Sequence, residues 1–123
     1  MPTESEHLRG GELNAAITSA IVGIQTKHLG RGPSHASTAH SDQVITVIMR
    51  DVMTRAEKAL VQTGERHAVM NMRQLLQEAM ESDFKAAVER LTGRKVLAFV
   101  SGNHVDPDIA VETFILDHPP AAA

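Results

Sequence analysis

The apolar residues of the N-terminal quarter follow a helical spacing. Between Glu12 and Leu29 they recur every three or four positions and form one stripe along a helix: Leu13, Ala16, Ile17, Ala20, Ile21 and Ile24. Gly30 stands where the cap of a helix C-terminus belongs, and Pro33 prevents the helix from continuing. The pattern therefore predicts a first helix over residues 12–29.

A strand-like pattern follows this helix. The polar stretch 34–39 is consistent with a short edge strand, and residues 40–42 predict a turn. The segment from Val44 to Met49 is rich in β-branched residues and apolar on both of its faces. Such a strand is central in its sheet and covered on both sides. We expect the second cover to come from another subunit, because the chain is small.

Two more helices are predicted in the middle of the chain. Thr54 and Glu57 form a capping box, which begins a short helix over 55–63 that ends at Gly64. A longer helix is predicted over 65–91, with this apolar stripe: Val69, Met72, Leu76, Met80 or Ala79, Phe84, Val88 and Leu91. At the usual rise this helix spans roughly 40 Å. We therefore expect a kink near Ser82 or an end that packs on a partner chain.

The chain closes with two predicted strands, Lys95–Ser101 and Ile109–Leu116, which pair as an antiparallel hairpin with a long loop. The predicted order is α-β-β-α-α-β-β. This order indicates an α+β fold, in which helices cover one face of a mostly antiparallel four-stranded sheet. We expect one domain over 12–117, with flexible tails at 1–11 and 118–123.

Composition excludes several classes of protein. The net charge is −3, there is no basic run, and Phe is the only aromatic residue type, which argues against nucleic-acid binding. The absence of cysteine excludes disulfides and thiolate metal sites. No apolar run approaches the roughly 20 residues of a membrane helix, and the polar N-terminus is unlike a signal peptide. We expect a cytoplasmic protein that does not insert into a membrane.

The loop between the last two strands holds the main cluster of chemically capable residues. Alternate residues of an extended segment point to the same side, so His104, Asp106 and Asp108 could converge on a metal or a polar ligand. A structural interpretation is favoured: Asp106 and Pro107 start a turn, Asp108 caps it, and His104 is exposed. Because three ligands make a weak metal signature, we predict no metal and no cofactor.

Two other charged residues are candidates for ligand binding. Arg31, in the connection after the first helix, could contact an anion. Glu112 lies inside the last strand and is either buried, with an arginine such as Arg50 as its partner, or exposed on the solvent face. Acid–base catalysis by His104 with Asp106 or Glu112 is the catalytic alternative. The sequence contains no nucleophile elbow and no H-E-x-x-H helix.

Several blocks of the chain resemble one bacterial family. They are NAAITSAIVGIQTKHLGRGP, VITVIMRDVMTRAEKALVQTG and TGRKVLAFVSGNHVDPDIAVETFIL, which together extend over most of residues 12–116. They are similar to the MpsC-like domain of a Na+-translocating membrane potential-generating system, a domain related to YbcI-type proteins. The resemblance implies an association with a Na+ or bicarbonate uptake system whose other subunits cross the membrane. It implies no catalytic residues.

From these observations we expect a non-catalytic cytoplasmic accessory or regulatory protein. The alternatives are a sensor of a small anion or other ligand, using Arg31, the 104–108 loop and Glu112, and an enzyme of unknown reaction. The doubly apolar strand and the long helix predict a homo-oligomer. A membrane protein is a further possible partner, and nucleic acid is not expected.

Overall fold

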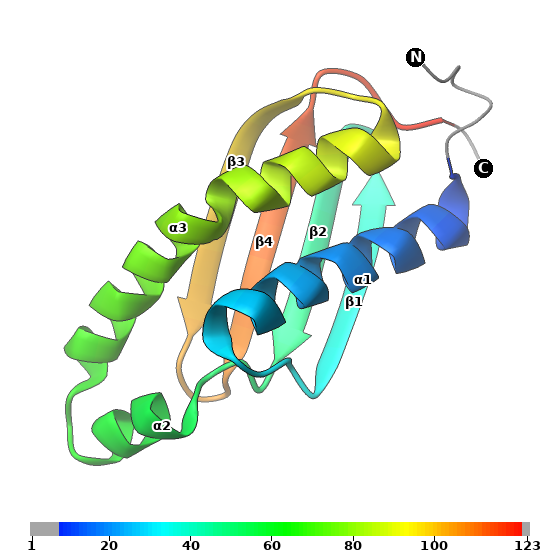
Figure 1. Ribbon diagram of the computed structural model, residues 1–123. Coiled ribbons are helices and arrows are strands. Elements are labelled where there is room, and N and C mark those ends of the chain that lie inside the picture. Colours follow the sequence, from blue (N-terminus) through cyan, green and yellow to red (C-terminus); the bar gives the residue numbers. More distant parts are fainter. Residues whose placement is uncertain (1–7, 122–123) are drawn as a thin grey trace.

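The computed structural model describes residues 8–121, and its helices and strands follow the predicted order α-β-β-α-α-β-β (Figure 1). The elements are α1 (Gly10–Leu29), β1 (His35–Ser41), β2 (Val44–Arg50), α2 (Arg55–Gln62), α3 (Arg66–Thr92), β3 (Val96–His104) and β4 (Ile109–Leu116). This arrangement confirms the predicted α+β class.

The four strands form one antiparallel sheet in the order β1-β2-β4-β3. Figure 1 shows α1 and α3 lying side by side across the same face of this sheet, with α2 beyond one end of it. The predicted placement of helices on one face is confirmed. Within residues 8–121, no helix covers the opposite face, which we call the open face of the sheet.

The main core lies between the sheet and the two long helices. Its fully buried side chains come from α1, α3 and the two central strands: Leu13, Ile17, Ile21, Met80, Phe84, Val88, Ile45, Val47, Met49, Phe114 and Leu116. Phe99 of β3 packs between Phe84 and Phe114, with ring centroids 6.0 Å and 5.1 Å away. The apolar faces that the sequence spacing predicts for the helices and for the strands thus pack against each other in one layer.

A second, smaller cluster holds the first turns of α3. Val69 packs there with Met53 and Val105, which come from the connections before α2 and after β3. α3 is one continuous helix of 27 residues through Ser82. Its extra length is accommodated by α2 and the neighbouring loops of the same chain, so the length alone does not require a partner.

The residues that the structure describes cover β2 on one face only. β2 is central, and Ile45, Val47 and Met49 are fully buried under the helices. On the open face, Val44 and Ile48 remain 38% and 39% exposed. Residues 8–121 therefore leave the apolar side chains of the open face without a cover.

Several boundaries differ from the sequence prediction. His40 and Ser41 belong to β1 rather than to a turn, since they pair with Ile45 and Val44 of β2. The His40 ring also bonds to Asn14 Oδ1 of α1 at 2.6 Å. The turn falls instead at Asp42, where the backbone is left-handed with φ 56°. β3 extends to His104, so the hairpin loop has only the four residues 105–108 rather than a long loop.

Parts of both predicted tails belong to the described structure. α1 begins at Gly10, inside the segment 1–11 predicted as a tail, while residues 1–7 of that tail lie outside the described residues. In the predicted tail 118–123, Ala121 is buried and Arg94 Nε donates to the Pro119 carbonyl at 2.7 Å. Residues 122–123 also lie outside the described part.

Candidate functional site

Glu112 is a carboxylate on the buried face of the sheet. Alternate residues of β4 point toward the helices, and Glu112 shares that face with Ala110 and Phe114. It is only 2% exposed. Of the two interpretations left open by the sequence, the structure therefore places Glu112 in the buried position. The arginine beside it is Arg73 of α3, whereas Arg50 is exposed.

A small cavity adjoins Glu112 between the sheet and the two long helices. Its lining is mostly polar and comes from four elements: Gln25, Arg73, Leu76, Gln77, Met80, Asn103 and Glu112. Two oxygen atoms of residues that line it, Gln25 Oε1 and Glu112 Oε2, are buried without a hydrogen-bond partner. Buried polar atoms without partners are uncommon, so this cluster is the strongest candidate site in the described chain.

Burial changes the acidity of Glu112. Removal from water disfavours the carboxylate and raises the pKa of Glu112 to about 7. The Ser101 hydroxyl, opposite Glu112 on β3, and the positive charge of Arg73 each lower that pKa in part. The site therefore holds a carboxyl group that changes charge near neutral pH.

Arg73 is itself held by a second buried acid. Its Nε and Nη2 atoms donate to Glu57 at 2.5 Å and 2.8 Å, and Nη2 also donates to the Val52 carbonyl at 2.8 Å. Glu57 closes the predicted capping box as well, since it accepts from the Thr54 amide at 2.9 Å. Because Glu57 matches the charge of Arg73, Glu112 lacks a counter-ion of its own.

Sequence reasoning missed Arg73. The predicted stripe of α3 placed Met72 in the core, but Met72 is 37% exposed and Arg73 is 4% exposed. Arg73 follows Val69 by one helical turn, which is the spacing that marks a shared face. The spacing therefore indicates that Arg73 shares the buried face of Val69, although a charged residue is rarely buried unless it is paired.

A polar groove on the surface adjoins the cavity. It lies between α3 and the end of β3, and it is rich in side-chain amides: Asn71, Gln74, Gln77 and Asn103 line it, together with Met70, Ser101 and Gly102. Gln77 and Asn103 line both the groove and the cavity. They therefore stand between the groove and the cavity.

The residues of the 104–108 loop hold the turn. The Asp106–Pro107 peptide bond is cis, and His104 Nδ1 lies 2.8 Å from the Pro107 carbonyl oxygen. Asp106 is exposed. Asp108 Oδ2 accepts from the Met53 amide at 2.8 Å, while Oδ1 is buried without a partner. Every one of these bonds ties the loop to neighbouring backbone.

Arg31 reaches the same backbone residue as Asp108. Arg31 Nη1 donates to the Met53 carbonyl at 2.6 Å. The amide and the carbonyl of Met53 are thus bonded to Asp108 and Arg31, respectively. Two of the predicted ligand-binding residues meet around one peptide segment, where their observed contacts join the connections after α1, β2 and β3.

The structure does not bring His104 and Glu112 together. His104 is exposed at the end of β3, and the alternation along β3 turns it toward the open face. Glu112 points to the helix face of the same sheet. Over residues 8–121, no three His, Asp or Glu side chains gather as a possible metal site.

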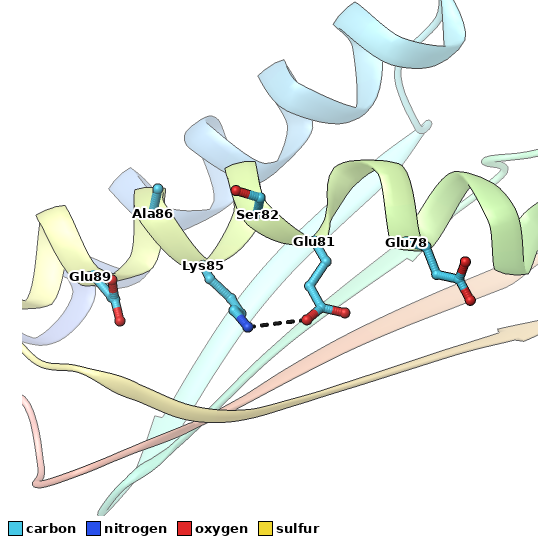
Figure 2. Close-up of a pocket in the computed structure, with 6 residues that line it drawn as sticks. All are labelled: Glu78, Glu81, Ser82, Lys85, Ala86 and Glu89. Atoms are coloured by element: carbon cyan, nitrogen blue, oxygen red, sulfur yellow. Dashed lines mark hydrogen bonds and ion pairs between the residues drawn. The ribbon is translucent and has the colours of Figure 1, made fainter.

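A hollow along the outer side of α3 is a weaker candidate for a ligand site than the cavity beside Glu112. Figure 2 shows Glu78, Glu81, Lys85 and Glu89 on one side of the helix, while Ser82 and Ala86 point to the other. Lys85 and Glu81 pair at 3.1 Å, and Glu89 accepts from the Val96 amide at 2.9 Å. Because these groups bond to one another or to backbone, the hollow has no feature that points to a ligand.

Comparison with known proteins adds one match. The family model described as Na+-translocating membrane potential-generating system (MpsC) matches residues 9–118. Comparison with curated proteins and with solved structures gave no match. In the described part of the chain, no helix is both long enough and apolar enough to span a bilayer. The family match takes in every helix and strand almost from end to end, so the resemblance seen in the sequence is confirmed and the chain belongs to the MpsC family.

Proposed function

We propose that this chain is a non-catalytic, cytoplasmic accessory or regulatory protein of a Na+-linked membrane potential-generating system. The family description supplies the system, and the open face of the sheet supplies a means of binding. The observation that carries the proposal is the composition of this face, which is that of a binding surface rather than of a site for chemistry.

The open face is apolar at its centre and polar at one edge. Most of its outward side chains on β2, β3 and β4 are apolar or threonine, and Arg50 and His104 stand at the ends of β2 and β3. The apolar residues and threonines are Val44, Thr46, Ile48, Val100, Ile109, Val111, Thr113 and Ile115. Val100 is 63% exposed. The edge strand β1 contributes His35, Ser37 and Ser41. A contiguous apolar patch with a polar rim is typical of an interaction surface.

A second copy of the chain is the occupant that this face fits best. The centre of the face carries no charged side chain, so two copies stack without burying an unpaired charge. Strand spacing and rise give the face an area on the order of 450 Å². Two stacked faces bury on the order of 900 Å², which approaches the lower limit of a specific interface, about 1,000 Å². The proposed assembly is therefore a homodimer whose two sheets pack face to face.

A ligand sensor is the second candidate function, and the unpaired oxygens around Glu112 favour it. Of the residues predicted for ligand binding, Arg31 and Asp108 bond to Met53, which supports a structural role for both. The enzyme alternative that joined His104 to Glu112 has no support, because their side chains lie on opposite faces of the sheet.

Cells that lack the gene provide the test of the accessory role. We expect their Na+-dependent membrane potential, measured with a potential-sensitive dye, to fall and to recover when the wild-type chain is supplied. The Leu75→Lys variant, which changes an exposed apolar residue of α3, should restore it equally well. The Val100→Lys variant, on the open face, should not. A potential that is the same with and without the gene contradicts the proposal.

A further inference from the structure

The outer edge of β3 is open to another strand. Within residues 8–121, β3 pairs only with β4, because the strand order is β1-β2-β4-β3. The bulge of β3 lies at its start, between Val96 and Ala98. From Ala98 to His104 the strand contains no proline, lysine, arginine, aspartate or glutamate, which are the residues that usually keep a second strand from an edge. Residues 98–104 therefore carry no feature that blocks strand addition.

The hydrogen bonds of β4 determine which backbone groups of β3 point outward. The Leu116 amide donates to the carbonyl of Gln43, which precedes β2, so every second residue of β4 counted back from Leu116 bonds to β2. The residues between them bond to β3, as does Asp117, whose amide donates to the Lys95 carbonyl. The register of β3 and β4 then leaves three residues of β3 with their backbone N–H and C=O at the free edge: Phe99, Ser101 and Asn103.

The amide-lined groove lies beside this free edge. Ser101, Gly102 and Asn103 line it from β3, and α3 contributes Asn71, Gln74 and Gln77 together with Met70. A strand in this groove pairs one edge with β3 and turns its alternate side chains and the rest of its backbone toward α3. Side-chain amides both donate and accept hydrogen bonds, so those of α3 match the peptide groups of an extended chain.

Gly102 is a second sign that another backbone approaches here. It does not have a positive φ, and a Cβ on it would meet no atom within 4 Å. Neither its conformation nor packing inside the described chain therefore requires glycine. Within a strand, glycine often marks a place where another backbone comes close.

The charges beside the groove indicate the kind of segment that fits. None of the residues that line the groove is charged, which suits uncharged polar side chains. Glu78 lies one helical turn after Gln74, on the same side of α3. Lys85, the cation of that side, is paired with Glu81 at 3.1 Å (Figure 2), so Glu78 is left to attract a lysine or arginine of the partner.

The same charges disfavour a second copy of the chain at this edge. A two-fold contact between two β3 strands would place the same side of α3 against itself. That side carries three acids and one base, namely Glu78, Glu81, Glu89 and Lys85. Like charges would thus face each other across the contact.

We propose that the free edge of β3 and the groove beside it bind an extended segment of a partner protein, which joins the sheet as a fifth strand. Its backbone pairs with Phe99, Ser101 and Asn103, its uncharged polar side chains contact the amides of α3, and a lysine or arginine lies next to Glu78. This mode of recognition is β-strand addition. The site lies outside the centre of the open face, so the inference does not depend on the accessory role or on the stacked dimer.

Selection from a displayed library of random peptides of about eight residues tests this site. We expect the wild-type chain to enrich peptides that contain β-branched residues and a lysine or arginine. The enriched peptides should bind Asn103→Pro roughly tenfold more weakly or worse, because proline removes an outward N–H. Asn103→Ala is the matched control, since it also loses the side-chain amide but keeps the N–H. No enrichment, or equal affinity of the two variants, overturns the proposal.

The amides of α3 are tested with the same enriched peptides. Gln74→Ala should weaken binding about threefold to tenfold through the loss of one hydrogen bond. Gln62→Ala removes an exposed amide from α2, away from the groove, and should leave the affinity unchanged. Equal losses in the two variants contradict the role of the groove.

Hydrogen exchange in the wild-type chain is a second measurement, because Asn103→Pro alters the strand itself. A bound peptide should slow exchange at the amides of Phe99, Ser101 and Asn103 and leave those of Val100 and Gly102, which bond to β4, unchanged. Protection without this alternation contradicts strand addition. If Asn103→Pro instead lowers the mass of the chain in light scattering, the edge pairs with a second copy and the proposal is wrong. A failure of the accessory role in cells would alter none of these results.

Discussion

Arg73 and Glu57 form a two-bond ion pair inside the protein. Their side chains are 4% and 1% exposed, and the shorter bond is 2.5 Å long. The pair joins α3 to the first turn of α2, and the Val52 carbonyl accepts a further bond from Arg73. Breaking such a pair leaves an uncompensated charge in the interior, which costs far more than the pair contributes when intact.

Arg73→Met should therefore lower the free energy of unfolding by about 3–5 kcal/mol. The reason is that Glu57 keeps its charge but loses its partner. Urea unfolding followed by circular dichroism measures the change. Lys85→Ala is the matched control, because it removes a cation of the same helix from a pair whose side chains are 39% and 42% exposed. The control should cost at most about 0.5 kcal/mol, and equal effects of the two variants would contradict the buried role of Arg73.

The raised pKa of Glu112 predicts how stability depends on pH. The folded chain holds a proton on Glu112 up to about pH 7, whereas the unfolded chain releases it near the ordinary glutamate pKa of 4.5. Between these values the native state binds more protons, so stability falls as pH rises. The loss is complete above the folded pKa and amounts to about 3 kcal/mol. Urea unfolding at a series of pH values measures this slope.

Glu112→Gln tests the same slope directly. The amide cannot ionise, so the fall in stability between these two pH values should largely disappear, and the variant should be more stable than the wild type above pH 7. Glu78→Gln, on the exposed side of α3, should keep the wild-type slope. A wild-type stability that is flat over this range contradicts the shifted pKa.

Asp108 is expected to hold the Met53 segment in place. Asp108→Ala removes the acceptor of the Met53 amide and should lower the free energy of unfolding by about 1–3 kcal/mol. Hydrogen exchange at the Met53 amide should accelerate in this variant. Asp106→Ala, two residues away and exposed, should change neither quantity. Slow exchange at Met53 in Asp108→Ala would show that the bond is unimportant.

The fold was predictable because its signals are local. The spacing of Leu13, Ile17 and Ile21, the β-branched run of β2 and the Thr54–Glu57 capping box each depend on neighbours a few residues away. Tertiary contacts moved the boundaries where they supplied partners. His40 remains in β1, where it pairs with Ile45 of β2, and its ring bonds to Asn14, 26 residues earlier.

The candidate site was only partly predictable, because its members come from separate elements. Glu112 was identified as a possible buried acid, but the alternation of β4 alone does not say which face is covered. Gln25 lies in the α1 stripe, one turn after Ile21. The apolar pattern does not predict its burial, because glutamine is usually exposed. Its position beside Glu112 depends on how α1 crosses the sheet, which no local pattern encodes.

The open face of the sheet gives the last prediction. If two copies stack through it, the wild-type chain should have the mass of a dimer in light scattering at micromolar concentration. Val100→Lys places a charge in the middle of the apolar contact, where burial is unfavourable, and should give a monomer with unchanged urea stability at low protein concentration. Leu75 is 66% exposed on α3, so Leu75→Lys should remain a dimer. A monomeric wild-type chain contradicts the stacked dimer and leaves the open face for a different protein. If Leu75→Lys is monomeric and Val100→Lys is not, the dimer contact lies on α3 instead.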